Sequence, residues 1–436
     1  MTRVLAVIIG MLTASWPAVA GAQALSGLAL FEQHCGRCHS SSDPSNRAPD
    51  RLSLAQRTPE AVLDAVTTGS MAVNARGLTD AQKRLIAEQL TLKPLGASAA
   101  GAASAMAGRC SAAGAAAAPG RGGAGWSGWG VDAQNSRFQR DGGLVAARVP
   151  ALQLKWAFAF PNGTSAYGQP AVVDGRVYVG SDNGFVYALD ADSGCVHWSF
   201  EAKGGVRTAV SVGTVAAAGA RRQAIYFGDL KGHVYAVDAR DGSLIWMRRA
   251  DPHPMTRITG APTLYEGRLY VPLSSLEEGA GANPNYECCT FRGGVVAYDA
   301  NTGTEAWRTY TVPVEPKRIK KNASGTQLWG PSGGAIWAAP TIDPKRGLIY
   351  VATGNGYTDP APETSDAVVA FDLKTGRLRW ARQVTPNDAY VVGCGANAPN
   401  RENCPDDEGP DFDFGNSPML RALPNGRSII TLGQKS

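Results

Sequence analysis

The chain has 436 residues, more than one ordinary hydrophobic core organises, so we expect at least two folded units. Its 52 glycines and 27 prolines, together with only 18% charged residues, favour a turn-rich all-β protein over a mainly helical one. The formal net charge of +5 is too small to indicate a nucleic-acid or anionic-membrane partner.

Residues 1–24 have the layout of a secretory signal peptide. Arg3 precedes an apolar run over 4–12, and small residues at 18–20 or 22–24 form candidate cleavage sites. The apolar run is well short of the ~20 residues of a membrane-spanning helix, and no later segment supplies that length. We therefore expect a periplasmic protein whose mature chain has no integral membrane segment.

Residues 25–95 have a helical pattern. An apolar stretch opens the segment, and helices are expected over 59–67 and 79–90. Thr79 is suited to be an N-cap, and Gln82 three residues later completes a capping-box pattern. The apolar stripe of the last helix comprises Leu78, Leu85, Ile86 and Leu90. The sequence therefore predicts a small all-α domain.

A haem-attachment motif lies in this domain. In Cys35-Gly-Arg-Cys38-His39 the two thiols can bond to the haem vinyl groups and the imidazole can ligate the iron, which predicts a cytochrome c domain with covalent haem c. A local disulfide or half of a zinc site is the alternative, but no second cysteine pair or histidine cluster lies nearby. Met71 is the expected sixth ligand, although a gap-filling core methionine is the other interpretation. His34 is less suited because it directly precedes the motif.

Residues 96–125 consist almost entirely of Ala, Gly and Ser, so we expect a flexible tether between two domains. The export compartment permits disulfides but does not assign them. Cys394 and Cys404 flank one short polar loop, and Cys110 and Cys195 remain as a long-range pair.

An eleven-residue motif repeats beyond Trp126. The pattern Ala-x-Asp-x-x-(Thr/Ser/Asp)-Gly-x-x-x-Trp occupies 188–198, 236–246, 297–307 and 370–380. Its Asp and Gly predict a tight hairpin turn, and its Trp is large enough to dock between neighbouring sheets. The lengthening intervals between copies fit four-stranded propeller blades with growing insertions on the functional face.

Each blade also has an inner-strand signature. The signatures lie at 167–170, 207–210, 259–262, 337–340 and 415–418. A fifth blade therefore begins, but the chain ends without another tryptophan motif. Because an open arc leaves sheet edges unpaired, we expect residues 126–436 to form an incomplete propeller, about three blades short.

The segment 126–138, the repeats and the adjacent cysteines Cys288 and Cys289 resemble the PQQ-dependent (pyrroloquinoline quinone) alcohol dehydrogenases. The resemblance covers nearly all of the chain after residue 24. The haem-first order resembles the cytochrome-type polyvinyl-alcohol dehydrogenases, whereas in quinohaemoprotein alcohol dehydrogenases the cytochrome follows the propeller. The resemblance implies an eight-bladed propeller, with about five blades in this chain, that oxidises alcohols and passes electrons through haem c to a soluble cytochrome c.

The resemblance also implies a PQQ site near the propeller axis. The implied PQQ contacts are Trp337 as the floor, Thr259, Ser274, Arg207 and a capping disulfide between Cys288 and Cys289. Two separate thiols are the alternative for the adjacent cysteines, and a surface ion pair is the alternative for Arg207. Glu277 and Asn355 match the family's calcium ligands. An insertion after Glu277 makes Glu278 and Glu287 alternative candidates for the acidic calcium ligand.

The family's catalytic base does not transfer directly. Thr-Pro-Asn-Asp388-Ala-Tyr-Val391 matches the start of the family's segment but has Val where the base belongs, and the pattern resumes at Asp411-Phe-Asp413. We therefore expect a loop over 391–410 that is closed by Cys394 and Cys404, with Asp411 as base and calcium ligand and Asp413 as the second choice. Lys435 resembles the basic group that hydrogen-bonds the reactive PQQ carbonyl.

Two other functions remain open at this point. The candidate substrates are the secondary alcohol groups of polyvinyl alcohol, small alcohols and sugars. A non-enzymatic propeller scaffold with an electron-transfer cytochrome domain is the remaining alternative. That scaffold would need neither calcium ligands nor adjacent cysteines.

Overall fold

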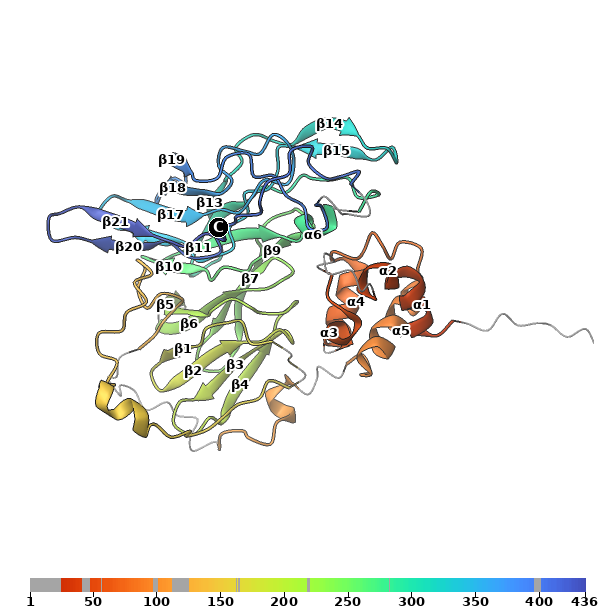
Figure 1. Ribbon diagram of the computed structural model, residues 1–436. Helices are drawn as coiled ribbons and strands as arrows, with labels where there is room; N and C mark the ends of the chain where they lie inside the picture. Colours follow the sequence, from red (N-terminus) through yellow and green to blue (C-terminus); the bar gives the residue numbers. More distant parts are fainter. Residues whose placement is uncertain are drawn as a thin grey trace, which may run out of the picture.

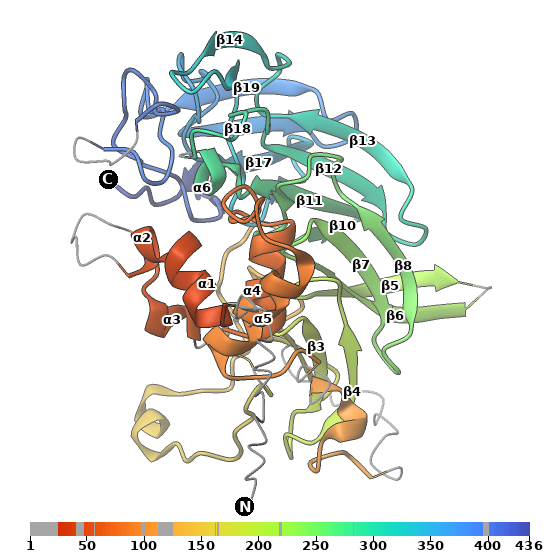
Figure 2. The same cartoon turned by 90° about the vertical axis from the view of Figure 1, so that its right-hand side faces the viewer.

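The computed structural model describes residues 25–40, 48–55, 57–96, 101–111, 125–161, 163, 165–217, 220–281, 283–395 and 401–436. The expected signal peptide lies outside the described residues. A helical domain lies beside a larger β region, on the side where the short helix α6 is found (Figures 1 and 2). No helix in the described part of the chain has the length and apolarity that crossing a membrane requires.

The helical domain has five short helices. They are α1 (Gly27–His34), α2 (Gly36–His39), α3 (Arg51–Ala55), α4 (Pro59–Thr67) and α5 (Asp80–Thr91). The predicted capping box is confirmed, since Thr79 and Gln82 exchange both bonds at the start of α5. A Cβ on Gly27 would lie 2.2 Å from a backbone oxygen of α5, so only glycine lets α1 cross that helix this closely. Leu30 and Phe31 of α1 pack against Ile86 and Leu90 in the domain core.

The β region consists of successive antiparallel sheets. The first contains β1 (Ala171–Val173), β2 (Arg176–Gly180), β3 (Phe185–Asp190) and β4 (Val196–Glu201), and the second β5 (Ser211–Ala217), β6 (Ala220–Gly228), β7 (His233–Asp238) and β8 (Leu244–Arg249). The third contains β9 (Thr256–Arg257), β10 (Thr263–Tyr265), β11 (Arg268–Ser275), β12 (Gly294–Asp299) and β13 (Glu305–Tyr310). The hairpin of β14 (Lys317–Lys321) and β15 (Gln327–Gly330) follows. The fourth contains β16 (Thr341–Asp343), β17 (Leu348–Ala352), β18 (Ala367–Asp372) and β19 (Leu378–Gln383), and β20 (Met419–Ala422) and β21 (Ser428–Thr431) begin a fifth.

The repeated motif explains how the sheets stack. Each copy forms the predicted hairpin, and Trp198 and Trp246 donate their indole N–H to carbonyl oxygens of Ala239 and Ala300 in the following sheet, at 3.1 and 2.9 Å. The motif glycine of that following sheet receives the ring, because a Cβ on Gly242 would lie 2.8 Å from Trp198. The glycine therefore serves both the turn and the sheet-to-sheet contact.

The first strands of the sheets meet along one line. Strands β1, β5 and β10 contact one another in turn, and β16 contacts β20. The segment 126–134 crosses these strands and bonds four sheets. Trp126 pairs with Val172 through backbone hydrogen bonds. Further backbone oxygens of the segment accept hydrogen bonds from the N–H groups of Val212, Ile342 and Leu420. This arrangement is that of propeller blades around a common axis, which positions residues of all the inner strands near one another.

The expected tether differs from the structure over 101–111. Cys110 forms a disulfide with Cys195 of the first sheet, Ala103 N–H donates to the hydroxyl of Ser199, and the short 3₁₀ helix η2 (Ala103–Ala105) lies against β4. The small residues have a packing role here, because a Cβ on Gly101 would meet the ring of Phe185 at 2.6 Å. Low apolar bulk alone therefore wrongly predicted flexibility for this stretch.

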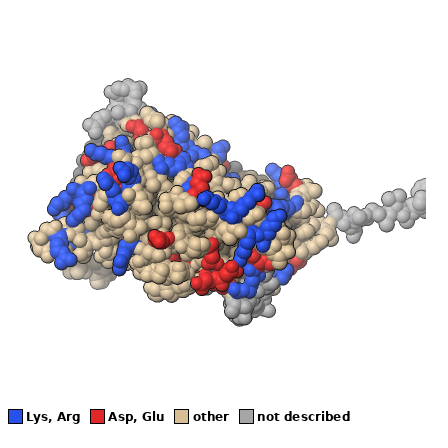
Figure 3. All heavy atoms as spheres, turned by 90° about the horizontal axis from the view of Figure 1, so that it is seen from above, with Lys and Arg blue, Asp and Glu red and all other residues tan. Residues whose placement is uncertain are grey.

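The molecule's outer surface mixes charges of both signs. Figure 3 shows Lys and Arg interspersed with Asp and Glu on one face.

A second 3₁₀ helix, η4 (Ala146–Ala151), leads from the crossing segment into residues 152–160. There Trp156 docks on the first sheet, with its indole N–H 3.1 Å from the Ala191 oxygen.

Candidate active site

The insertion after β11 begins with α6 (Glu277–Gly281) and leads to the adjacent cysteines. Cys288 and Cys289 form a buried disulfide, as expected from the resemblance. The backbone of Trp329 in β15 bonds to both cysteines, at 2.6 and 3.1 Å. A Cβ on Gly281 would lie 2.8 Å from the Cys288 sulfur, so glycine allows α6 to pack directly on the disulfide.

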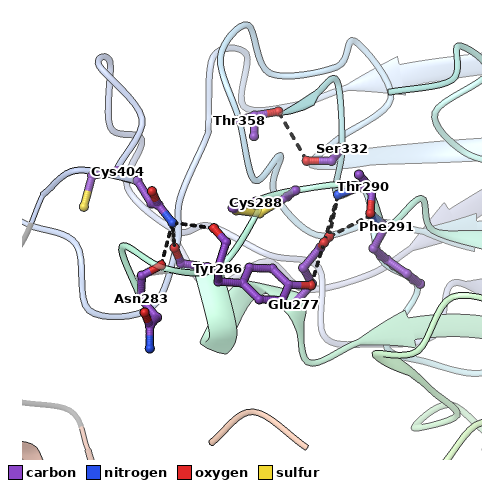
Figure 4. Close-up of a disulfide and its surroundings, with 12 residues drawn as sticks. Glu277, Asn283, Tyr286, Cys288, Thr290, Phe291, Ser332, Thr358 and Cys404 are labelled. Carbon is purple, nitrogen blue, oxygen red and sulfur yellow. Dashed lines mark hydrogen bonds between the residues drawn. A yellow bond between two sulfur atoms is a disulfide. The ribbon is translucent and has the colours of Figure 1, made fainter. Parts of the chain in front are cut away.

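Glu277 is fully buried, and its carboxylate accepts hydrogen bonds from neighbouring groups (Figure 4). It accepts hydrogen bonds from the Thr290 N–H at 2.8 Å, the Phe291 N–H at 2.7 Å and the Tyr286 hydroxyl at 3.0 Å. His253 Nε2 lies 3.5 Å away. Glu277 therefore ties α6 to the strand that follows the disulfide.

Glu278 is also buried but faces a different set of groups. Burial, and then the charges of Asp413 and Asp411, raise the pKa of Glu278 to about 8. The third acidic residue in contention, Glu287, is exposed. Of the three, Glu278 is thus the one whose carboxyl interacts electrostatically with Asp411, another predicted calcium ligand.

Asn355 follows β17 and is buried in the same region. Its Nδ2 donates to the oxygens of Gly356 and Tyr390, at 2.7 and 2.9 Å, which turns Oδ1 the other way. Within the described residues that buried oxygen has no hydrogen-bond partner. The Asn355 backbone N–H donates to Asp413 Oδ1 at 3.0 Å, so Asp413 lies directly beside this amide.

Lys435 bridges the two aspartates predicted as base candidates. Its Nζ lies 2.7 Å from Asp411 Oδ1 and 2.9 Å from Asp413 Oδ2. Burial acts against the charged form, but the hydrogen bonds to Asp411 and Asp413 outweigh it and raise the pKa of Lys435. The Asp388 carboxylate accepts from the N–H groups of Asp411 and Phe412, at 3.1 and 2.8 Å. Asp388 therefore shapes the loop that presents Asp411.

The residues predicted to contact PQQ fall into two groups. Thr259 and Ser274 share a 2.8 Å hydrogen bond, and the Thr259 hydroxyl donates to the Trp337 oxygen at 3.2 Å. Trp337 packs against the core cluster that contains Cys288 and Cys289. Arg207 is separate from this group, because it is exposed and its guanidinium lies 5.0 Å from the Tyr167 ring centre.

Sequence reasoning missed two buried ionisable residues here. Both Asp366 oxygens are buried without a hydrogen-bond partner among the described residues. Burial, and then the charges of Asp388, Asp413 and Asp411, raise the pKa of Asp366 to about 9. Burial and the neighbouring Arg207 lower the pKa of Arg257 to about 9. Arg257 lies two residues before Thr259 in the chain, so the inner-strand alternation could have identified it.

The predicted haem ligands lie in the helical domain. Cys35 and Cys38 are the two cysteines outside the three disulfides. His39 is buried, and its Nδ1 lies 2.7 Å from the Pro49 oxygen, which leaves Nε2 for a metal. Met71 packs against the same core cluster as Cys35. The residues are therefore suited to hold a haem.

A cavity of about 570 Å³ is lined by residues that include Asn387, next to Asp388, but none of the predicted cofactor, metal or catalytic residues. The β14–β15 hairpin, the segment after Tyr357 and the loop closed by the Cys394–Cys404 disulfide line it. Its wall includes Leu328, Thr358, Asp359, Asn387 and Asp407. This mixture of apolar and hydrogen-bonding groups is typical of small-molecule pockets.

Known proteins resemble this chain over most of its length. A polyvinylalcohol dehydrogenase of a Pseudomonas species is 42% identical over 420 residues, and one of a Sphingopyxis species is 37% identical over 427 residues. These matches cover 94% and 95% of this chain, and the chain spans 64% of the length of each relative. The crystal structure of a quinohemoprotein alcohol dehydrogenase from Comamonas testosteroni has the same fold, with a TM-score of 0.53 and 23% identity over 77% of this chain and 49% of that chain.

A family model describes the larger domain. The model for the β-propeller domain of glucose/ethanol/alcohol dehydrogenases, designated PQQ, matches residues 126–396, which is more than half of the chain. Those residues contain the stacked sheets, α6, the adjacent cysteines and Asn355. The chain therefore belongs to the PQQ β-propeller family of glucose/ethanol/alcohol dehydrogenases.

Proposed function

We propose that this chain oxidises alcohols with PQQ and a bound calcium ion, and that electrons pass to a haem c in its helical domain. The observation that carries the proposal is the buried cluster of Glu278, Asn355 and Asp413 with Asp411 and Lys435. Family membership supports PQQ as the cofactor. The relatives named polyvinylalcohol dehydrogenase support alcohol oxidation.

The cation would be held by oxygen atoms of Glu278, Asn355 and Asp413. Calcium prefers carboxylate and amide oxygens, and the unpartnered Oδ1 of Asn355 fits a ligand that a cation would complete. Glu278 is preferred to Glu277 because the Glu277 carboxylate already accepts from Thr290, Phe291 and Tyr286.

Asp411 is proposed as the general base that removes the hydroxyl proton of the alcohol. Lys435 keeps Asp411 ionised through the 2.7 Å ion pair, and Asp388 orients it through its backbone N–H. When bound, PQQ supplies a two-electron acceptor for the substrate hydride, and calcium polarises its carbonyl. Lys435 is also placed to donate a hydrogen bond to that carbonyl.

The residues proposed to hold PQQ surround this cluster. Trp337 would form the floor, the disulfide of Cys288 and Cys289 the cap, and the hydroxyl pair of Thr259 and Ser274 an edge. The Trp337 indole N–H is buried without a partner among the described residues, which leaves a donor for a ligand. Arg207 and the neighbouring Arg257 offer positive charge for the PQQ carboxylates.

We propose residues 25–95 as a cytochrome c domain with haem bonded to Cys35 and Cys38. His39 and Met71 would ligate the iron, and the bond from His39 Nδ1 to Pro49 would fix the imidazole. When bound, haem supplies the one-electron acceptor that a two-electron oxidation needs for reoxidation. A soluble cytochrome c is the proposed external acceptor, and residues 1–24 would direct export to the periplasm.

The proposed substrates are the secondary alcohol groups of polyvinyl alcohol, which become ketones. The relatives' names support this choice. Small alcohols and sugars are the alternative substrates.

The test loads purified protein with PQQ and calcium and follows reduction of soluble cytochrome c with polyvinyl alcohol, 2-propanol or glucose. We expect polyvinyl alcohol and 2-propanol to be oxidised. Asp411→Asn should keep PQQ and haem absorbance yet lose about 10²- to 10⁴-fold in rate. Asp413→Asn is the matched control and should be milder at saturating calcium. A chain that binds neither PQQ nor calcium would overturn the proposal and favour the scaffold alternative.

A further inference from the structure

The loop that carries Met71 touches the propeller through one side-chain amide. Asn74 Nδ2 lies 3.5 Å from Met71 Sδ and donates to it. Asn74 Oδ1 accepts from Asn283 Nδ2, in the insertion that follows α6. The two ends of one amide group thus connect the thioether of Met71 with the propeller.

Asn283 is held rigidly enough to act on that amide. Its Oδ1 accepts from the Asn285 N–H at 2.9 Å, and its own N–H donates to the Ala280 oxygen at 3.1 Å. Its carbonyl accepts from Asn403 Nδ2 at 2.7 Å. Figure 4 shows Asn283 on the same insertion as Tyr286 and Cys288. Asn283 is therefore fixed from both α6 and the loop closed by the Cys394–Cys404 disulfide.

A second contact orients the two domains. Asp64 of α4 and Lys231 of the propeller form an ion pair at 2.9 Å. Both side chains are partly exposed, at 42% and 36%, so the pair contributes little affinity. It nevertheless gives the interface a second contact point beside the Asn74 contact.

We propose that Asn283 of the propeller is a positioning residue for Met71: through Asn74 it orients the thioether that ligates the haem iron. The inference rests on the proposed function in that it requires haem at Cys35, Cys38 and His39. A hydrogen bond to the sulfur reduces the electron density that the ligand donates and so favours the reduced iron. Docking on the propeller therefore raises the reduction potential of the haem.

The same insertion carries Glu278, the proposed cation ligand, only five residues before Asn283. A cation held by Glu278 would therefore be bound on the same insertion from which Asn283 reaches Asn74. Through this shared insertion, calcium would be expected to change the haem potential by way of Asn283.

The experiment measures the haem reduction potential and the thioether-to-iron absorption band of the complete haem-loaded protein. Asn283→Asp removes the donated hydrogen bond at constant size, and Asn283→Ala removes the whole amide. Both should lower the potential by an amount equal to a five- to tenfold change in the reduced-to-oxidised ratio, about the effect of one hydrogen bond. Asn74→Leu should lower it at least as much, and Asn285→Ala, an exposed neighbour, should leave it unchanged.

Unchanged potentials and band intensities in both Asn283 variants, with calcium shifting the wild-type and variant haems equally, would overturn the inference. Alcohol oxidation with bound PQQ would still support the proposed function in that case. A wild-type chain without covalent haem would overturn both. Thermal melting of each variant separates lost ligand positioning from lost folding.

Discussion

Replacing the buried Asp366 by Asn should stabilise the protein, and by more as the pH rises. Asp366 is fully buried, and its folded-state pKa of about 9 lies far above the ordinary value of 3.8 for an Asp carboxyl. Between these pH values the folded chain keeps a proton that the unfolded chain releases. The free energy of unfolding therefore falls as the pH rises from about 4 to about 9.

The size of the effect follows from this difference in bound protons. Each pH unit in the window costs roughly 1.4 kcal/mol, so the wild type loses up to about 4 kcal/mol between pH 5 and pH 8 relative to Asp366→Asn. For a β region of this size, with an unfolding entropy of about 0.65 kcal/mol/K, the advantage of the variant in melting temperature should grow by about 6 °C. The neutral amide has the same shape and needs no proton.

Melting temperatures of wild type and Asp366→Asn, measured at each pH from 5 to 8 without added ligands, test this reasoning. Asp343→Asn is the control, because the Asp343 carboxyl should change the free energy of unfolding with pH in the opposite direction. Despite burial, hydrogen bonds from Arg346 and Tyr350 lower the pKa of Asp343, so its contribution is present at neutral pH and lost as the pH falls through the folded pKa. A melting-temperature difference between Asp366→Asn and wild type that stays constant with pH would refute the assignment of a neutral buried carboxyl.

Three further outcomes are expected. Asp411→Asn should abolish the pH-dependent proton removal while leaving cofactor content intact, as absorbance can verify. Glu278→Gln should weaken calcium binding at least tenfold in calorimetry. Glu277→Gln should mainly lower stability, by about 1–3 kcal/mol, because one of the two acceptor oxygens becomes an NH₂ group that faces buried donors. The reverse pattern would assign the metal to Glu277. Gly242→Ala should destabilise more than Gly267→Ala in denaturant unfolding, since both have positive φ but only Gly242 faces a tryptophan ring. Equal losses in the two glycine variants would contradict the docking argument.

Local chemistry made much of the fold predictable from the sequence. In three copies the motif Asp accepts from the N–H groups two and three residues on, as Asp190, Asp299 and Asp372 do. In the remaining copy Asp238 accepts from the N–H group two residues on. The capping box of Thr79 and Gln82 is equally local. The pairing of Cys394 with Cys404 followed from their short separation and is confirmed.

Features that depend on distant packing were not predictable. Glu277 and Glu278 are adjacent in sequence, and only the path of α6 determines which carboxylate meets the backbone of Phe291 and which meets Asp413. The burial of Asp366 likewise depends on segments far away in the chain, because an isolated acidic residue is normally exposed. The docking of residues 101–111 on the first sheet could not be predicted, because it depends on the surface of that sheet, to which Cys110 is bonded through Cys195.

Repeats and insertions have different roles, and this difference explains where the candidate site residues lie. The motif copies use their repeated positions for turns and for contacts between sheets, and the one buried motif carboxylate, Asp238, is paired with Arg222 at 2.9 Å. The insertions supply the carboxylates of the candidate site, and they stabilise each other, since Asn403 of one donates to the oxygens of Gly281, Asn283 and Tyr286 in another. A change in either insertion therefore affects the cation ligands, the disulfide cap and the contact with the helical domain together, whereas a change in a repeat mainly affects stability.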